Sequence, residues 1–362
     1  MALILGVETS CDETSIAVIR GDEELALVTR ANLEGQAEYG GVVPEIAARQ
    51  HIAVIGPVYE QALARARVRA DDLDAIAVTY GPGLAGSLIV GLNLARGLAT
   101  GLGIPLLAVN HLEAHVLASW IGRPATDLPE LPAVCLVVSG GHTDLTLMRT
   151  AGRHELLGRT RDDAAGEAFD KVARVLELGF PGGPAIQKAA GELPDGSSKP
   201  YALPRAWLRD TYDFSFSGVK TAVYRAWAGK LGPAEEQRIF RGEGDEPLRE
   251  REPAAIARMA AGFQEAVVDV LVGKTAVAAE EFAARSVILA GGVAANLALR
   301  EALTARLDIP LFLPAIRHCM DNGAMIAMAG ARLLQHGQLA PDDLDIDPGL
   351  ELTARELARP AD

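Results

Sequence analysis

The sequence predicts a duplicated α/β fold, in which two α/β halves of similar design face a central cleft and the second half carries insertions. Apolar segments with the length of strands alternate with longer segments of helical periodicity. The order of strands, polar turns and helices in residues 1–131 recurs in residues 132–340. Residues 341–362 are polar, and we expect them to form a peripheral tail.

The first half begins with a strand at residues 3–9, followed by a polar turn and a second strand at 16–19. A third strand is predicted near residues 24–29. Pro44 then suits the first turn of a long helix. The remaining elements expected in this half are a strand at 74–80, the turn Gly81-Pro82-Gly83, an apolar helix at 84–102, a strand at 104–109 and a helix at 116–121.

The second half repeats this order. Its strand at 133–139, polar turn and strand at 145–149 match the start of the first half. Residues 286–290, the following glycines and a helix from Val293 match residues 74–102, and residues 308–313 match 103–108. The insertions are predicted to be a helix at 162–178, a tight loop at 181–184, a segment at 214–220 that leads into a helix, a charged surface insertion at 229–253 and a long helix at 253–282. Such alternation predicts parallel strands that carry ligands at their carboxyl ends.

Length and charge limit the functions that are open to the chain. Its 362 residues suffice for two domains, and 49% hydrophobic with 23% charged residues is ordinary for a soluble globular protein. The net charge of −14 argues against a broad nucleic-acid-binding surface. Any nucleic acid would therefore need a local basic patch or a basic partner.

Cysteine usage and hydropathy indicate a compartment. The three cysteines form no CxxC pair, which favours a reducing environment. The N-terminus has no basic region typical of a signal peptide. The most apolar stretch, 84–102, is interrupted by Asn93 and Arg96, which favours a buried helix over a membrane span. We expect a cytoplasmic protein that is not associated with a membrane.

Two histidines at helical spacing form a candidate metal site. His111 and His115 are four residues apart, so on a helix both imidazoles lie on one face. Asp321 follows the matching strand of the second half, and two facing halves would bring these three residues together across one cleft. Two imidazoles and one carboxylate leave open coordination positions, as a catalytic ion requires. The alternative is a pair of helical histidines without a ligand.

Two polar hairpin turns occupy equivalent positions of the repeat, at residues 8–15 and 139–144. Gly140 and Gly141 allow a close backbone approach and present N–H groups to an anion. One such turn alone is typical of an ordinary hairpin, but a matched pair is more specific. The turns resemble the phosphate-binding hairpins of the actin, sugar-kinase and heat-shock ATPase superfamily. Residues 291–296 resemble the adenosine segment of that superfamily.

A more specific resemblance extends from about residue 3 to residue 332. The chain resembles the tRNA N6-adenosine threonylcarbamoyltransferase family, also called the O-sialoglycoprotein endopeptidase family. The segments that carry this resemblance, in the order of the family, are ETSCDETS (8–15), YGGVVPE (39–45), GPG (81–83), NHLEAH (110–115), VSGGHT (138–143), FDK (169–171), PGGP (181–184), FSFSGVKT (214–221), GGVAAN (291–296) and DNGAMIA (321–327).

The resemblance implies an activity and a set of site residues. The activity is transfer of the threonylcarbamoyl group from threonylcarbamoyl-AMP to the N6 amine of the adenosine adjacent to the anticodon, in tRNAs that read ANN codons. It implies one divalent metal ion, Fe²⁺ in preference to Zn²⁺, on His111, His115 and Asp321. The implied substrate-binding residues are Val138, Ser139, Gly140, Gly141, His142, Asp170, Gly183 and Asn296. The implied partners are tRNA, a paralogous inactive TsaB-like protein and a small TsaE-like ATPase.

The catalytic residue stays open at this point. A mixed anhydride is already activated, so the reaction needs no strong protein nucleophile. Asp12 and Glu13 are candidates to position the amine or accept its proton, and capping of the turn is the alternative role. The chain departs from the family pattern at Gln187, where many bacterial members have a ribose-contacting aspartate, and at Gly323 and Leu297.

The sequence has features in common with three other functional classes. A metallopeptidase needs a base beside the ion, but Glu113 lies two residues from each histidine and points away from them. A sugar or acetate kinase shares the hairpins, but kinases of this superfamily do not usually carry the two histidines and the aspartate. A non-catalytic paralogue would lose the metal ligands, and this chain keeps all three.

Overall fold

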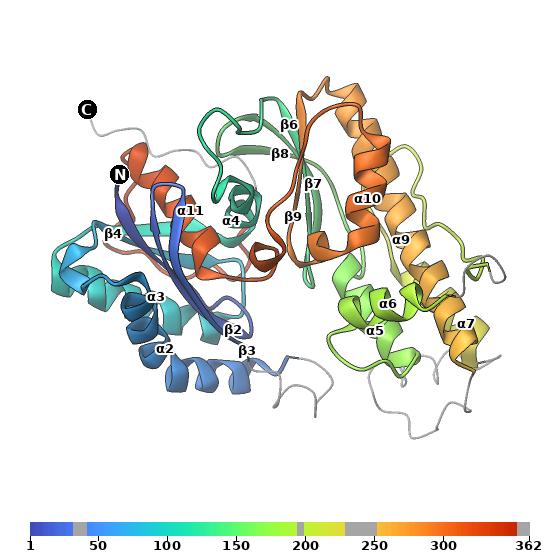
Figure 1. Cartoon of the computed structure of the whole chain (residues 1–362), viewed down its shortest axis with the longest axis horizontal. Helices are drawn as coiled ribbons and strands as arrows, with labels where there is room; N and C mark the ends of the chain where they lie inside the picture. The colour runs from blue at the N-terminus through green and yellow to red at the C-terminus, as the bar shows by residue number, and fades with distance from the viewer. Residues whose placement is uncertain (32–41, 194–198, 229–251, 353–362) are drawn as a thin grey trace. The chain divides into compact units, whose positions relative to one another are not determined.

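The computed structural model describes residues 1–31, 42–193, 199–228 and 252–352, and the chain divides into two compact units (Figure 1). The first unit comprises Met1–Leu128 and Leu313–Asp362, and the second comprises Pro129–Phe312. The first boundary lies within three residues of the predicted one, and the main difference from the predicted halves comes at Leu313. The chain from Leu313 onward returns to the first unit, so residues 313–340 do not belong with the second half.

The first unit is built on a five-stranded mixed sheet with the order β3-β2-β1-β4-β5. β1, β2 and β3 are antiparallel neighbours, and β4 and β5 run parallel to β1. The strands are β1 Leu3–Glu8, β2 Glu13–Arg20, β3 Glu23–Ala31, β4 Ala75–Gly81 and β5 Leu106–Asn110. The predicted strand–turn–strand unit and the two following strands are therefore confirmed.

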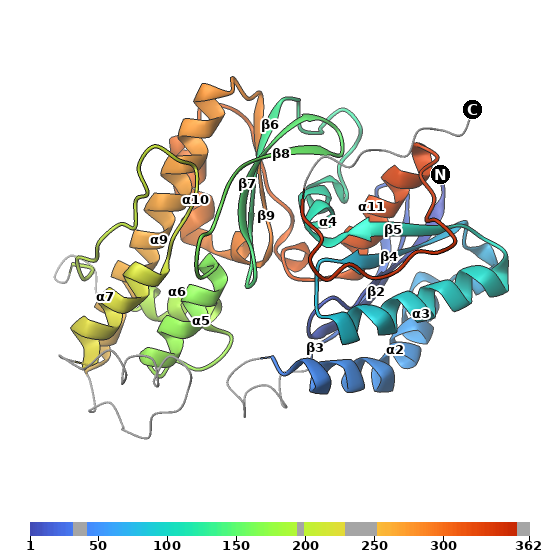
Figure 2. The same ribbon diagram turned by 180° about the vertical axis from the view of Figure 1, so that it is seen from behind.

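Helices cover both faces of this sheet. On one face Leu5 and Val7 of β1 share a hydrophobic core with residues of α2 (Pro44–Ala66) and α3 (Ala85–Leu102). Gly6 points to the opposite face, because side chains alternate along a strand. There it meets α11 (Gly323–Gln335), which also packs on β2, β4 and β5 and on α4 (Figures 1 and 2).

The second unit repeats the sheet of the first. Its order is β10-β9-β6-β7-β8, with β6, β7 and β8 antiparallel and β9 and β10 parallel to β6. Each strand thus has a counterpart in the first unit, and the predicted duplication is confirmed. The strands are β6 Ala133–Val138, β7 Thr143–Thr150, β8 Arg153–Arg159, β9 Ser286–Ala290 and β10 Leu311–Phe312.

The helices of the second unit gather around the long helix α9 (Pro253–Glu281), which contacts β6. α6, α7 and α10 pack on α9, and α5 packs on α6 and α7. The ring centroids of Phe169 in α5 and Phe263 in α9 lie 5.1 Å apart, edge to face. The bounds are α5 Ala165–Val175, α6 Gly182–Gly191, α7 Ser217–Ala228 and α10 Leu297–Arg306.

Two elements and one boundary in this unit were not predicted. β8 extends the sheet beyond the expected hairpin, and the expected tight loop at 181–184 is the start of α6. The helix expected from Val293 begins instead at Leu297, because Gly292–Ala295 forms a 3-10 turn and the Asn296 side chain caps the helix that follows. Residues 229–251 of the charged insertion lie outside the described chain, as do residues 39–41 of the YGGVVPE segment.

Residues 341–352, the described part of the tail, are mostly exposed and contact the first unit at a few positions. Leu344 belongs to the hydrophobic core that includes Leu5 and Val7, and the Asp347 backbone N–H donates to the Tyr80 carbonyl at 2.8 Å. A side chain at Gly81 would place its Cβ 1.9 Å from the Asp347 carbonyl oxygen, so this position requires glycine. The return of the tail explains the first glycine of the GPG segment.

α3 is the one described helix that is long and apolar enough to cross a membrane. Of its residues Ala85–Leu102, 33% are buried. Its buried residues include Leu88, Leu92 and Ala95, and it packs on β4 and α2. One face of α3 is therefore buried against the first unit, whereas the sequence predicts a buried helix as a whole.

Candidate functional site

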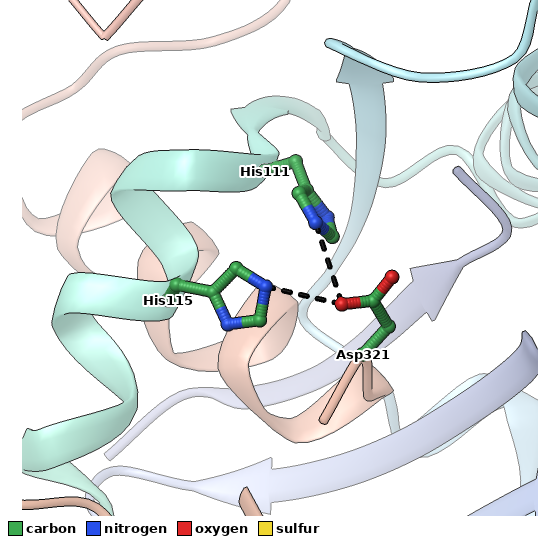
Figure 3. A group of neighbouring side chains, drawn as sticks. All are labelled: His111, His115 and Asp321. Atoms are coloured by element: carbon green, nitrogen blue, oxygen red, sulfur yellow. Dashed lines mark hydrogen bonds and ion pairs between the residues drawn. The ribbon is translucent and has the colours of Figure 1, made fainter. Parts of the chain in front are cut away.

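Both histidines of the candidate metal site lie on one short helix, α4 (His111–Leu117), directly after β5. The Asn110 side chain accepts hydrogen bonds from the N–H groups of Leu112 and Glu113, at 2.9 and 3.3 Å. This cap starts the helix at His111. The imidazoles of His111 and His115 therefore project from the same face, with ring centroids 4.6 Å apart (Figure 3).

Asp321 lies in the loop that precedes α11 (Figure 3). The next residue, Asn322, caps α11 through the Met325 N–H and donates to the carbonyls of His318 and Met320, at 3.2 and 2.7 Å. Gly323 begins the helix so close to the sheet that a Cβ there would lie 2.6 Å from the Ala17 nitrogen. The glycine that departs from the family pattern thus allows the close packing that carries Asp321 to α4.

The three side chains converge. One Asp321 oxygen, Oδ1, lies 3.1 Å from His115 Nε2 and 3.4 Å from His111 Nε2. One ligand atom from each residue lies within 4.8 Å of the others. All three residues belong to the first unit, because the chain returns to it after β10. The expectation that the aspartate approaches from the second half is therefore wrong, although the predicted trio is brought together.

This cluster fits a divalent metal ion. Atoms that share one ion at bond lengths of about 2.0–2.2 Å lie about 3.0–3.5 Å apart, and both separations to Asp321 fall in that range. Both histidines are buried, and each directs Nε2 at the carboxylate. Glu113 is not part of the trio. Two imidazoles with one carboxylate suit iron or zinc and leave room for a substrate oxygen.

Glu8, at the carboxyl end of β1, adjoins the metal cluster. Its Oε2 lies 3.1 Å from His111 Nδ1, on the side of the ring away from Asp321. Its two oxygens also accept hydrogen bonds from the Ser10 N–H and the Thr79 hydroxyl, each at 2.5 Å. The Ser10 hydroxyl lies 3.2 Å from the same imidazole nitrogen.

Burial and opposite charge act against each other in this cluster. Burial alone would raise the pKa of Asp321, but the two histidines hold it well below its usual range. Burial would lower the pKa of His111, and the charges of Asp321 and Glu8 outweigh it and raise that pKa well above 6.5. The pKa of His115 is lowered, chiefly by burial. The site is thus a pair of carboxylates with an imidazole between them, which suits a cation.

The polar turn between β1 and β2 brings the candidate catalytic residues to the same place. Burial and the charges of Asp321 and Asp12 raise the pKa of Glu13 well above its ordinary value. His51 of α2 contacts this turn at two points. Its Nδ1 lies 2.7 Å from the Thr14 hydroxyl, and its Nε2 lies 2.9 Å from the Cys11 carbonyl oxygen. The effect of Asp321 on the Glu13 pKa indicates that Glu13 lies close to a metal ligand.

In the second unit, the turn between β6 and β7 lies against the start of α5. The Ser139 N–H donates to the His142 carbonyl, and the Ser139 carbonyl accepts from the Gly166 N–H, at 2.8 and 3.1 Å. Apart from the adjacent residues of the chain, no atom of the described residues lies within 4 Å of a Cβ built at Gly140 or Gly141. The packing of the protein does not require glycine there, so the small residues leave space beside their N–H groups for something else.

Asp170 and Gly183 meet where α5 approaches the start of α6. One Asp170 carboxylate oxygen accepts the Gly182 N–H at 2.7 Å, which caps α6 from a neighbouring helix. A Cβ at Gly182 would lie 2.5 Å from the Asp170 Cα, whereas the position at Gly183 is open. The pair therefore presents an open helix start beside a carboxylate.

Asn296 lies at the start of α10 and has partners at both ends of its amide. Its oxygen accepts the Leu299 N–H at 3.0 Å, and its nitrogen donates to the Gln264 side chain at 2.8 Å. Gln187 of α6 accepts the Leu297 N–H at 2.7 Å, so the residue that departs from the family pattern ties α6 to α10. Gly291 (φ 88°) places this segment against β6, since a Cβ there would lie 2.4 Å from the Val138 carbonyl oxygen.

Comparison with known proteins assigns the family. A sequence model of the family described as "TsaD: tRNA N6-adenosine threonylcarbamoyltransferase" matches residues 24–328. The chain belongs to this family. The resemblance inferred from short segments is thereby confirmed.

Relatives within the family match over nearly their whole length. A tRNA N6-adenosine threonylcarbamoyltransferase of Thermomicrobium roseum is 51% identical, with 99% of each chain covered. The proteins of the same name from Symbiobacterium thermophilum and Dehalococcoides mccartyi are 50% and 46% identical, over 97% of this chain and 97% and 99% of theirs.

Solved structures share the fold of this family member at low sequence identity. HypF of T. kodakarensis superposes with a TM-score of 0.57 at 15% identity, covering 95% of this chain and 49% of HypF. Component A of the (R)-2-hydroxyglutaryl-CoA dehydratase of Acidaminococcus fermentans gives 0.51 at 15% identity, covering 92% and 98%. The predicted duplicated actin-like α/β fold is confirmed, while the predicted cleft between the halves stays a prediction.

The sequence analysis assigned no role to three buried residues near the turn between β1 and β2: Glu8 and Ser10, which contact His111, and His51, which contacts Thr14 and Cys11. Each is buried and contacts its partner across the fold. One signal was available for Glu8, since a carboxylate ends the otherwise apolar strand Leu-Ile-Leu-Gly-Val-Glu. A buried charge costs free energy unless it is paired and hydrogen-bonded, so a carboxylate at that point predicts partners that the fold brings to it.

Proposed function

We propose that this chain transfers the threonylcarbamoyl group from threonylcarbamoyl-AMP to the N6 amine of the adenosine adjacent to the anticodon in tRNAs that read ANN codons. The observation that carries this is family membership over nearly the full length. The cluster of His111, His115 and Asp321 agrees with it, because the chain keeps a complete set of metal ligands.

One divalent ion, Fe²⁺ in preference to Zn²⁺, is proposed on the two Nε2 atoms and the Asp321 carboxylate. When bound, the ion supplies Lewis acidity and a fixed point for the oxygens of the threonylcarbamoyl group. His111 and His115 contribute neutral nitrogen donors, and the burial of both rings keeps competing water away. Asp321 supplies the negative charge that a divalent cation needs.

The adenylate is assigned to the second unit. The open N–H groups around Gly140 and Gly141, with Val138, Ser139 and His142 beside them, suit the phosphate. The Asp170 carboxylate and the open position at Gly183 suit the ribose. Asn296, at the start of α10, suits the base. The resemblance implies substrate binding by all three segments, and the space at Gly140, Gly141 and Gly183 supports the first two assignments.

The chemical step needs one proton acceptor. The N6 amine forms a bond to the carbamoyl carbon, the bond from that carbon to the AMP phosphate oxygen breaks, and the amine loses a proton. Glu13, at the start of β2 in the turn that follows Glu8, is a candidate to accept it. Asp12, the adjacent carboxylate, is the candidate for orienting the amine.

The rival functions gain no support from the site. A metallopeptidase would place a base against the ion, and Glu113 is not among the clustered ligands. A kinase would have no use for the histidine pair. The proposed setting is the cytoplasm without membrane attachment, with tRNA, an inactive paralogous TsaB-like protein and a small TsaE-like ATPase as partners.

The direct test is incubation of the purified chain with threonylcarbamoyl-AMP and unmodified tRNA, with and without the two partner proteins. Nucleoside analysis by mass spectrometry should detect N6-threonylcarbamoyladenosine in the complete mixture. His115→Ala should give none. Product formation by this variant at the wild-type rate, or no product in any mixture, would reject the proposal.

A further inference from the structure

The carboxylate of Glu8 is buried and forms hydrogen bonds with three neighbouring residues. Glu8 is 0% exposed, and its hydrogen-bond partners within the described chain are Ser10, Thr79 and His111. None of them is a lysine or an arginine. A buried carboxylate costs free energy unless it is paired, and in this otherwise apolar strand the partner that can carry a positive charge is His111. Its placement therefore calls for an explanation beyond packing.

The carboxylate is fixed in orientation before it meets the imidazole. Oε1 accepts the Ser10 N–H, a group that can only donate, and Oε2 accepts the Thr79 hydroxyl of the neighbouring strand β4. Oε2 is thus an acceptor, and it lies 3.1 Å from His111 Nδ1. A hydrogen bond between these two atoms requires the proton to be on Nδ1.

We propose that Glu8 is a positioning residue of the metal centre, which accepts the Nδ1–H of His111 and so directs the Nε2 lone pair at the ion shared with Asp321. This inference rests on the proposed metal site. A ligand histidine whose other nitrogen donates to a carboxylate is held in one tautomer and one ring orientation. Glu8 touches neither the ion nor the substrate.

Ser10 could stabilise the other tautomer of His111, in which the ring proton is on Nε2. Its hydroxyl lies 3.2 Å from the same Nδ1 and could donate to it. In that arrangement the ring proton would be on Nε2, facing Asp321, and no lone pair would be available to the ion. A carboxylate is the stronger acceptor for an N–H group, so Glu8 decides in favour of the binding tautomer.

The second histidine has no comparable anchor. His115 Nδ1 is buried and has no hydrogen-bond partner among the described residues. Its orientation depends on packing within α4 and on Asp321. Loss of Glu8 should therefore act through His111 alone.

The test compares Glu8→Gln with Thr79→Val in the full chain. In Glu8→Gln the amide oxygen can still accept the Ser10 N–H, which turns the amide NH₂ toward His111 and favours the wrong tautomer. Thr79→Val removes a different hydrogen bond to the same carboxylate and keeps the acceptor. Zn²⁺ affinity, measured by competition with a chromophoric chelator, should fall about 10–100-fold in Glu8→Gln. It should stay within about threefold of wild type in Thr79→Val.

A second measurement uses the wild-type protein and does not depend on the variant folding. In the Zn²⁺-loaded chain, ¹⁵N NMR should show His111 bound through Nε2, with a slowly exchanging proton on Nδ1. Coordination through Nδ1, or unchanged Zn²⁺ affinity in a folded Glu8→Gln variant, would overturn the role of Glu8. Failure of the metal site itself has a different signature, since His111→Ala would then bind Zn²⁺ as the wild type does.

Discussion

At the scale of single residues, the metal ligands give the sharpest prediction. Purified wild-type protein should hold about one divalent ion per chain, and His115→Ala should lose both the ion and transferase activity. The reason is geometric, because His115 Nε2 lies 3.1 Å from Asp321 Oδ1 and no other side chain of the cluster can replace it. Metal analysis of the dialysed proteins checks this.

The control for that variant is His336→Ala, which changes an exposed histidine of the first unit outside the cluster. It should keep the ion and the activity. Circular dichroism should show that both variants are folded. Full metal occupancy in a His111→Ala, His115→Ala double variant would remove the basis for the assignment.

The sequence predicted these ligands but not the residues behind them. His111 and His115 were found because helical spacing is a local property, and Asp321 because the repeat marks the end of the matching strand. Glu8 and Ser10 were missed because their contacts to His111 span 103 and 101 residues. No local pattern encodes a contact of that kind.

At the scale of elements, β8 carries a histidine that should make the second unit sensitive to acid. His154 is 3% exposed, its Nδ1 lies 3.1 Å from the Thr146 hydroxyl, and its Nε2 has no partner in the described chain. Burial lowers the pKa of His154 from 6.5 to about 4. Between these two pH values the unfolded chain binds the proton and the folded chain does not, so stability falls as pH falls.

The expected loss across this window is on the order of 3 kcal/mol, from 1.36 kcal/mol for each pKa unit. Urea denaturation at pH 7.5, 6, 5 and 4.5 would measure it. His154→Gln should flatten the dependence by that amount, whereas Thr146→Val should keep it, because burial and not the hydroxyl is the cause. Equal slopes in wild type and His154→Gln would show that another group is responsible.

The adenylate-contacting elements give a second prediction at this scale. AMP at millimolar concentration should raise the melting temperature of the wild type, since a ligand at 100 times its Kd stabilises by about 2.7 kcal/mol. Asn296→Ala should melt earlier without ligand, because a lost N-cap costs about 1 kcal/mol. Its AMP-dependent shift should also be smaller, and that difference isolates binding from stability.

The matched control is Asn93→Ala on α3, which removes an exposed asparagine that bonds to the Ile89 carbonyl within its own helix. Its AMP-dependent shift should equal that of the wild type. Metal content should be unchanged in both variants, because Asn296 lies in the second unit and the metal ligands in the first. An Asn296→Ala shift as large as the wild type's would reject the assignment of this segment to the base.

Most elements followed from periodicity and capping, and the exceptions share a cause. α6 begins Gly-Gly-Pro, which locally favours a loop, but the Asp170 carboxylate of another helix caps it. β8 (Arg-His-Glu-Leu-Leu-Gly-Arg) lacks a clear apolar alternation and forms through pairing with β7. In both cases tertiary contacts outweigh local preference.

At the scale of the whole molecule, the path of the chain could not be predicted from the repeat. Residues 308–313 match 103–108, so the sequence suggests that the following helix closes the second half. Instead α11 packs on β1, β2, β4 and β5, where Gly6 and Gly323 allow a close approach. That long-range packing, rather than any local signal, carries Asp321 to the histidines.

Charge is the other property of the whole molecule, and it bears on the proposed substrate. With 34 basic and 48 acidic residues, the chain has a net charge of −14, while tRNA is a polyanion. Long-range electrostatics should therefore oppose capture of tRNA by the chain alone. The apolar helices of the first unit offer a place for partners, since Ile52 on α2 and Ile89 on α3 are 67% and 45% exposed.

We therefore predict that the isolated chain binds tRNA weakly and turns over poorly, and that partner proteins supply or complete a basic surface. Filter binding at one fixed salt concentration should give a much lower Kd for the reconstituted assembly than for the chain. Ile52→Glu should reduce assembly and turnover while leaving the metal content unchanged, because the residue is exposed and is not one of the metal ligands. Replacing the exposed Val277 of α9 in the second unit by glutamate should have no such effect. Sub-micromolar tRNA binding with multiple turnovers by the lone chain at near-physiological salt would mean that it carries its own tRNA surface, despite its charge.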